Sequence, residues 1–126
     1  MTMEEKVCFR SGDFELEGLF ENGHTARGVV ITHPHPLYGG DMHNPVVETI
    51  RRAYRMKGVA TLRFNFRGTG ESEGQHDNGV GEQDEVLAAL SFLMESGIIS
   101  YRDPNVYPVF ILATTSVTSS SGSISC

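Results

Sequence analysis

Three runs of β-branched and aromatic residues, separated by two stretches with helical periodicity, constrain this chain more than any other feature. The runs cover residues 28–32, 59–66 and 106–113, and the first lacks the alternation of a half-exposed strand. The helical stretches cover about residues 45–57 and 81–96. Strands that alternate with helices are joined by right-handed crossovers and form a mostly parallel sheet with helices on its faces. We therefore expect an α/β fold.

The first helix is predicted from its boundaries and its apolar spacing. Asn44 is a suitable N-cap before a proline, and Val46, Ile50 and Tyr54 recur every four residues. Its basic residues lie toward the C-terminal end, where the helix macrodipole favours cations, so we interpret them as structural and not as a binding patch. These residues are Arg51, Arg52, Arg55 and Lys57.

The remaining elements are an N-terminal hairpin and a second helix. Residues 6–10 and 14–20 alternate apolar and polar side chains around the turn Ser11-Gly12-Asp13, which predicts two antiparallel strands. The helix at 81–96 buries one face, with Val86, Leu90 and Leu93 at helical spacing. Its acidic start (Glu82, Asp84 and Glu85) suits the positive end of the macrodipole.

Composition excludes several classes of function. The chain has 126 residues and a net charge of −6, so it fits one domain and offers little to a phosphate backbone. It contains no apolar run of the roughly 20 residues that span a bilayer and no signal-peptide pattern, so we expect no membrane partner and a cytoplasmic location. Cys8 and Cys126 lack metal-ligand spacing and are expected to be free thiols.

The loop after the 28–32 strand holds three histidines, an aspartate and two glycines. One interpretation is a metal site built from His33, His35, Asp41 and His43. Another uses the backbone: Pro34 and Pro36 cannot donate, so the N–H of His35 is the first one after His33 that can stabilise an oxyanion. A third is that the prolines with Gly39 and Gly40 only shape a rigid turn.

The loop after the 59–66 strand is also rich in glycine but is not a phosphate cradle. Glu73 stands where a G-x-G-x-x-G pattern requires glycine, and Glu71 would repel an anion. We expect Arg67, directly after a buried strand, to anchor loops by hydrogen bonds. Gly68 and Gly70 are expected to shape the turn.

Taken together, the two loops resemble those of the α/β-hydrolase superfamily. The motifs are His33-Pro34-His35-Pro36-Leu37-Tyr38-Gly39-Gly40 and Arg67-Gly68-Thr69-Gly70-Glu71-Ser72-Glu73-Gly74, at the ends of consecutive strands. The chain is similar to the small bacterial serine hydrolases related to dienelactone hydrolases, over about residues 6–113. The resemblance implies a cofactor-free hydrolase with no resident metal, acting on a small-molecule ester, lactone or peptide. It also implies that the His35 loop forms part of an oxyanion hole.

The same resemblance places a catalytic serine after the 106–113 strand. In a G-x-S-x-G elbow the serine is the nucleophile and the next residue donates its N–H to the oxyanion, which corresponds to Ser116 and Val117. Thr114 and Thr118 stand where the superfamily has glycine, and a β-branched residue fits such an elbow poorly.

The region after Asp103 departs from the superfamily pattern. It carries no charged residue, and residues 114–126 are a low-complexity tract of Ser and Thr that we expect to be disordered. The triad order is Ser, acid, His, yet all five histidines precede Ser116. We therefore expect residues 1–113 to be the N-terminal part of a hydrolase domain, C-terminally truncated or frame-altered and catalytically incomplete.

Two alternative functions stay open at this stage. The chain could be a non-catalytic module that pairs with another chain, including a second copy of itself, through an exposed strand edge at Val109 to Leu112. Less favoured is the metal-binding protein with the four ligands given above.

Overall fold

The computed structural model describes residues 3–25, 27–33, 40–75, 81–95 and 109–112, the last group for its backbone only. The order of elements is hairpin, strand, helix, strand, helix, strand, as the sequence predicts. Their bounds are β1 Glu5–Ser11, β2 Phe14–Glu21, β3 Gly28–Ile31, α1 Pro45–Met56, β4 Ala60–Phe64, α2 Glu82–Glu95 and β5 Val109–Leu112.

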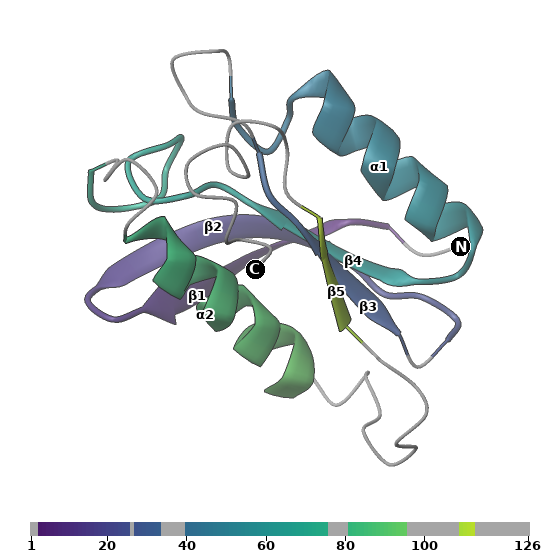
Figure 1. Ribbon diagram of the computed structural model, residues 1–126. Helices are drawn as coiled ribbons and strands as arrows, with labels where there is room; N and C mark the ends of the chain where they lie inside the picture. Colours follow the sequence, from purple (N-terminus) through teal and green to yellow (C-terminus); the bar gives the residue numbers. More distant parts are fainter. Residues whose placement is uncertain (1–2, 26, 34–39, 76–80, 96–108, 113–126) are drawn as a thin grey trace.

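The strands form one mixed sheet in the order β1-β2-β4-β3-β5 (Figure 1). β2 is antiparallel to both β1 and β4, whereas β3 is parallel to β4 and to β5. The predicted α/β fold with an N-terminal hairpin is therefore confirmed. Because β3 and β4 are parallel neighbours, their carboxyl ends lie side by side at one edge of the sheet.

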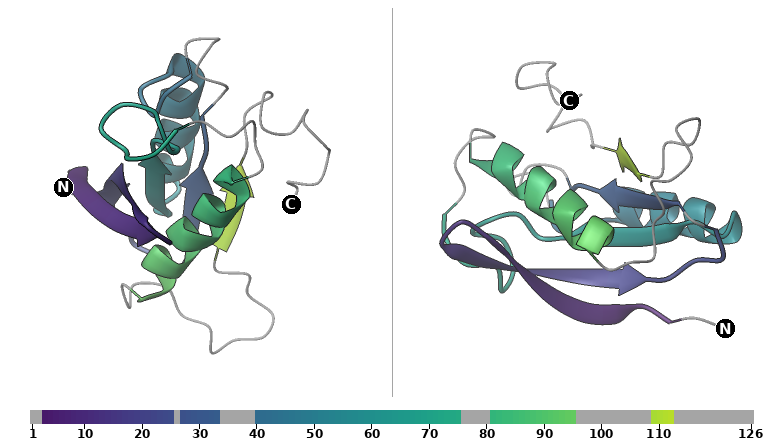
Figure 2. Two further views of the ribbon diagram at one scale, coloured as in Figure 1. Left: turned by 90° about the vertical axis from the view of Figure 1, so that its left-hand side faces the viewer. Right: turned by 90° about the horizontal axis from the view of Figure 1, so that it is seen from below.

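The two helices cover opposite faces of this sheet (Figure 2). Residues alternate between the faces along β3: Val29 and Ile31 pack with Val47 of α1, while Val30 belongs to the core on the α2 side. The α2 side holds the larger and more aromatic core. Its fully or nearly buried members include Phe9, Leu16, Phe20, Leu62, Phe64, Phe66, Val86, Ala89 and Leu93.

The start of α1 agrees with the sequence, but its buried face is turned by one residue. The Oδ1 atom of Asn44 accepts a hydrogen bond from the Val46 N–H at 2.9 Å, with Pro45 in the first turn. Val46 itself is exposed, and Val47 is buried with Ile50 and Tyr54 packed beside it. The expectation that Val46 leads the apolar face is therefore wrong, because the stripe follows i, i+3, i+7 spacing from Val47.

The arginines of α1 owe their placement to specific carboxylates, which the macrodipole interpretation missed. Arg51 is buried and pairs with Glu21 of β2 at 3.0 Å and with Glu48 one turn before it. Arg63 of β4 is likewise buried, and it pairs with Glu48 at 2.9 Å and with Glu4 at 2.6 Å. We call Glu4, Glu21, Glu48, Arg51 and Arg63 the ion cluster. It joins α1 to the sheet and to the N-terminal segment.

β4 ends at Phe64, two residues before its predicted end. The Asn65 N–H donates to the Glu17 carbonyl at 3.0 Å, and the Phe66 N–H donates to the Nε2 atom of His33 at 3.0 Å. The second of these bonds goes to a side chain and not to a neighbouring strand, so the chain leaves the ladder. Residues 106–108 and 113, which belong to the predicted last strand, lie outside the described residues.

Candidate active site

Asn65 connects three segments at the carboxyl edge of the sheet. Its Oδ1 atom accepts the Met42 N–H at 2.8 Å, and its Nδ2 group donates to Glu17 Oε2 at 2.7 Å. Its carbonyl accepts the Ser72 hydroxyl at 2.7 Å. Since Asn65 is only 2% exposed, these bonds are shielded from water and hold the loops after β3 and β4 to β2.

His33 is the last described residue before the segment that follows β3, and the Nε2 atom of its imidazole is engaged within the fold. Nε2 accepts the Phe66 N–H, and the ring packs edge-on against the Phe66 ring with centroids 5.0 Å apart. A neutral imidazole that accepts through Nε2 carries its proton on Nδ1. His33 therefore positions the β4 loop (residues 65–74), and its Nε2 lone pair is not available to a metal or a substrate.

The metal interpretation gains no support from the other ligands that the structure describes. The Oδ1 atom of Asp41 accepts the backbone N–H of His43 at 2.8 Å, as in a local turn. No group of three or more His, Cys, Asp or Glu side chains that could hold a metal ion occurs among the described residues. His35 lies outside them.

Arg67 ties the β4 loop to α2 and to the hairpin. Its N–H donates to Glu85 Oε1 at 2.9 Å, its Nε atom donates to Glu85 Oε2, and its Nη2 group donates to the Gly81 carbonyl at 3.1 Å. The guanidinium also lies over the Phe14 ring, 4.8 Å from the centroid. Burial raises the pKa of the fully buried Glu85 carboxyl, and the hydrogen bonds and charge of Arg67 oppose that rise.

The two loop glycines adopt conformations that other residues rarely take. Gly68 has φ of 76° and Gly70 has φ of 55°. A Cβ on Gly70 would lie 2.4 Å from both Asn65 Nδ2 and Glu17 Oε2. Glycine at position 70 is therefore required twice, by the backbone conformation and by the approach of the buried Asn65–Glu17 pair.

No family model matches the chain. The chain is 37% identical over 93 residues to an uncharacterized protein of Rickettsia prowazekii, a match that covers 72% of this chain and 39% of that protein. Among solved structures, an alpha-beta serine hydrolase homologue from Coxiella burnetii is 30% identical with a TM-score of 0.81. That match covers 96% of this chain and 56% of the Coxiella chain.

The chain has the fold of the α/β-hydrolase superfamily and is similar to its serine hydrolase homologues over most of its own length. A putative alpha/beta hydrolase from Agrobacterium tumefaciens supports the same assignment, at 30% identity and a TM-score of 0.75, over 86% of this chain and 48% of that one. The chain thus spans about half the length of these solved relatives. No helix in the described ranges is long and apolar enough to cross a membrane.

The structure describes only some of the residues that the superfamily resemblance singles out. His33 is hydrogen-bonded to Phe66 at the carboxyl ends of the strands, Arg67, Gly68 and Gly70 follow Phe66 in the β4 loop, and Gly40 is a buried residue just before Asp41. Four of the residues lie outside the described ones: Gly39, expected to shape the loop; His35 and Val117, the expected oxyanion donors; and Ser116, the expected nucleophile.

Sequence reasoning missed the residues that hold the superfamily loops in place, namely Asn65, Glu17 and Glu85. A signal was present for Asn65, because it stands between Phe64 and Phe66 in a strongly apolar run, where a polar side chain needs a buried partner. Glu17 and Glu85 carried no comparable signal. Glu17 fits the alternation of polar and apolar residues in the hairpin, and Glu85 resembles an ordinary acidic residue at the N-terminus of a helix, where it complements the macrodipole.

Proposed function

We propose that this chain supplies the oxyanion side and the nucleophile of a serine hydrolase that cleaves an ester or amide bond. The observation that carries the proposal is the clamp between the ends of β3 and β4. The Phe66 N–H donates a hydrogen bond to His33 Nε2 at 3.0 Å, and the Met42 N–H donates one to Asn65 Oδ1 at 2.8 Å. These bonds hold the residues on both sides of the segment that contains His35, and fixed donors are what an oxyanion hole needs.

In this proposal each residue has a defined role. The Ser116 hydroxyl attacks the carbonyl carbon of the substrate, its proton passes to a general base, and the acyl-enzyme is then hydrolysed by water. The N–H groups of His35 and Val117 donate to the oxyanion. His33 is a positioning residue, because its Nε2 atom already accepts the Phe66 N–H.

The proposed substrate is a small ester, lactone or peptide, by analogy with dienelactone-hydrolase-like enzymes. In the superfamily the triad histidine follows the serine, whereas all five histidines of this chain precede Ser116. We propose that the chain alone therefore lacks the general base. A positioned base contributes roughly 10²- to 10⁴-fold to the rate.

Chemical rescue tests this proposal directly. The folded chain and its Ser116→Ala variant are treated with a fluorophosphonate probe, with and without added imidazole as a substitute base. We expect labelling of the wild-type chain to be weak alone and to rise with imidazole, and labelling of the variant to stay at background. Circular dichroism of both proteins checks that they share one fold.

The alternative outcomes are informative as well. Strong Ser116-dependent labelling without imidazole would show that the chain is already complete. Labelling that persists in Ser116→Ala would assign the nucleophile elsewhere. A folded chain that shows no Ser116-dependent labelling even with imidazole would refute the proposed nucleophile and favour the second candidate below.

The second candidate is a non-catalytic module that pairs through β5. Within the described part of the sheet, β5 is hydrogen-bonded to β3 on one side and has no described strand on the other. A free strand edge can pair with another chain, including a second copy. Size-exclusion chromatography with light scattering over a wide concentration range tests this, because a mass that stays monomeric throughout contradicts self-pairing.

A further inference from the structure

Glu17 of β2 is a buried carboxylate that lies opposite Asn65, just beyond the end of β4. The residue is 8% exposed, and its backbone carbonyl accepts the Asn65 N–H at 3.0 Å. Its Oε2 atom accepts both the Asn65 Nδ2 group at 2.7 Å and the Glu71 N–H at 2.6 Å. Lys6, the cation that pairs with it, is half exposed and lies 3.7 Å from Oε1. The buried carboxylate is therefore satisfied chiefly by two donors of the β4 loop.

The side-chain amide of Asn65 has only one orientation that suits both of its neighbours. An ionised carboxylate only accepts hydrogen bonds, and a backbone N–H only donates them. The NH₂ group must therefore face Glu17, which leaves Oδ1 for the Met42 N–H at 2.8 Å. The reversed amide would place a donor against the Met42 N–H and an oxygen against the carboxylate. Glu17 thus determines which atom of Asn65 meets the loop after β3.

Met42 is the residue through which this orientation acts on the loop after β3. It is 4% exposed, and its carbonyl accepts the Arg63 Nη1 group at 3.0 Å. Both backbone polar groups of Met42 are thus bonded to side chains at the end of β4, from Arg63 and Asn65. His33 is tethered on the other side of the segment that contains His35. If the Asn65 amide turned, one of these tethers would be lost.

From these contacts we propose that Glu17 is a positioning residue for the oxyanion hole and acts through the Asn65 amide on the loop after β3. The inference rests on the proposed function, because it concerns the same His35 donor. The Glu17 carboxylate takes no part in the bond changes. It holds the amide in the orientation that keeps Met42 in place, and a donor displaced by about 1 Å can cost on the order of 100-fold in rate.

Two substitutions of Glu17 separate the hydrogen bond from the size of the side chain. Glu17→Gln keeps an oxygen acceptor for the Asn65 amide, whereas Glu17→Met has a similar length and no such acceptor. Fluorophosphonate labelling of Ser116 is measured on the full chain with imidazole, over a range of probe concentrations. For Glu17→Met we expect the maximal labelling rate to fall about tenfold or more, with little change in the half-saturating probe concentration. Glu17→Gln should label like the wild-type chain, and an equal loss in both variants would overturn the inference.

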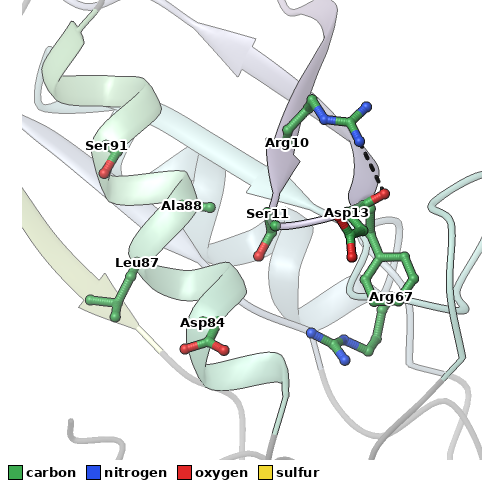
Figure 3. A pocket seen from close by; sticks show the side chains of 10 residues that line it. Arg10, Ser11, Asp13, Arg67, Asp84, Leu87, Ala88 and Ser91 are labelled. Atoms are coloured by element: carbon green, nitrogen blue, oxygen red, sulfur yellow. Dashed lines mark hydrogen bonds between the residues drawn. The ribbon is translucent and has the colours of Figure 1, made fainter.

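Two control variants account for lost stability and lost charge. Glu21→Gln, further along the same strand and opposite Thr61, weakens the ion cluster. Asp84→Asn removes a charge in a pocket of about 440 Å³ between the β1–β2 turn and α2, whose lining includes none of Glu17, Asn65 and Met42 (Figure 3). Both controls should label like the wild-type chain. A loss in either one as large as in Glu17→Met would overturn the inference, because labelling would then follow stability or charge.

Amide hydrogen exchange gives a second measurement that needs no catalysis. In Glu17→Met the Met42 N–H should exchange about tenfold faster or more, while the amides of β4 stay protected. In Glu17→Gln it should exchange as in the wild-type chain. Unchanged Met42 exchange in Glu17→Met would overturn the inference. If the wild-type chain showed no Ser116-dependent labelling, the proposed function would fail, and Met42 exchange would still decide whether Glu17 positions the loop.

The wild-type chain also provides a test that does not depend on the folding of any variant. The Nδ2 protons of Asn65 should exchange much more slowly than those of Asn22, whose residue is exposed. Equally fast exchange of the two side-chain amides would show that Glu17 does not hold the Asn65 amide.

Discussion

At the scale of single residues, the carboxyl edge of the sheet depends on a few polar groups that are buried together. Asn65, Glu17 and Ser72 share four hydrogen bonds, three of which cross between segments that are far apart in the sequence. Buried polar networks are favourable only when every member is satisfied. The contacts around Gly70 are therefore the most sensitive point of the loop.

Gly70→Ala should destabilise the fold by about 2 kcal/mol or more. The new Cβ would meet Asn65 and Glu17 at 2.4 Å, in addition to the cost of a positive φ. Urea denaturation measures the change in unfolding free energy.

Gly12→Ala is the matched control for this variant. Gly12 has a similar φ of 58°, but a Cβ there would meet nothing within 4 Å. It should cost only the backbone term, about 1 kcal/mol. Equal losses in the two variants would show that the close approach at Gly70 is unimportant.

At the scale of elements, α1 is fixed to the sheet by its apolar residues and, on the same buried face, by Arg51 of the ion cluster. Three carboxylates of the cluster come from the N-terminal segment, β2 and α1, so that the two buried arginines connect all three. Removing one partner from such a cluster leaves a buried charge uncompensated, which is costly.

Glu48→Gln should lower the free energy of unfolding at neutral pH by about 1–2 kcal/mol. It should also make that free energy depend less on pH in the acidic range. The Arg51 hydrogen bond lowers the pKa of Glu48 from 4.5 to about 2. A carboxyl with a depressed folded-state pKa contributes stability above its unfolded pKa and loses it as the pH falls. Urea unfolding between pH 4.5 and about 2 should therefore show a steeper decline for the wild-type chain than for the variant.

Glu95→Gln is the control for the acid series, because Glu95 is an exposed helix residue outside the ion cluster. It should follow the wild-type curve. If Glu48→Gln also followed that curve, the depressed pKa of Glu48 would not be linked to folding.

At the scale of the whole molecule, β4 is the centre of the described sheet. All five of its residues are buried, and it pairs with β2 on one side and β3 on the other. β1 pairs with β2 alone among the described strands and alternates between exposed and buried residues. Cooperative opening should therefore start at the hairpin.

Amide hydrogen exchange tests this order. We expect the amides of β4 to exchange at the rate of global unfolding and those of β1 to exchange through a lower-energy local opening. Equal protection of both strands would indicate that the hairpin and the parallel strands unfold as one unit.

The sequence by itself determined the order of elements, the α/β class and the two loops that resemble the superfamily, whereas the expected mostly parallel sheet is mixed, with two antiparallel and two parallel strand pairs among the described strands. These are local properties: the cap at Asn44, the apolar runs, and the glycines and prolines that follow them all act within a few residues. The predicted ends of the helices and strands were less accurate. The end of β4 depends on His33, which is far from Phe66 in the sequence.

Only the tertiary structure decided which polar residues are partners. Glu21 with Arg51, Glu85 with Arg67 and Glu17 with Asn65 are separated widely along the chain, and the glutamate of each pair resembles an ordinary surface or helix-end residue when its local sequence is considered. Such pairings depend on how distant segments pack, and packing leaves no local pattern in the sequence.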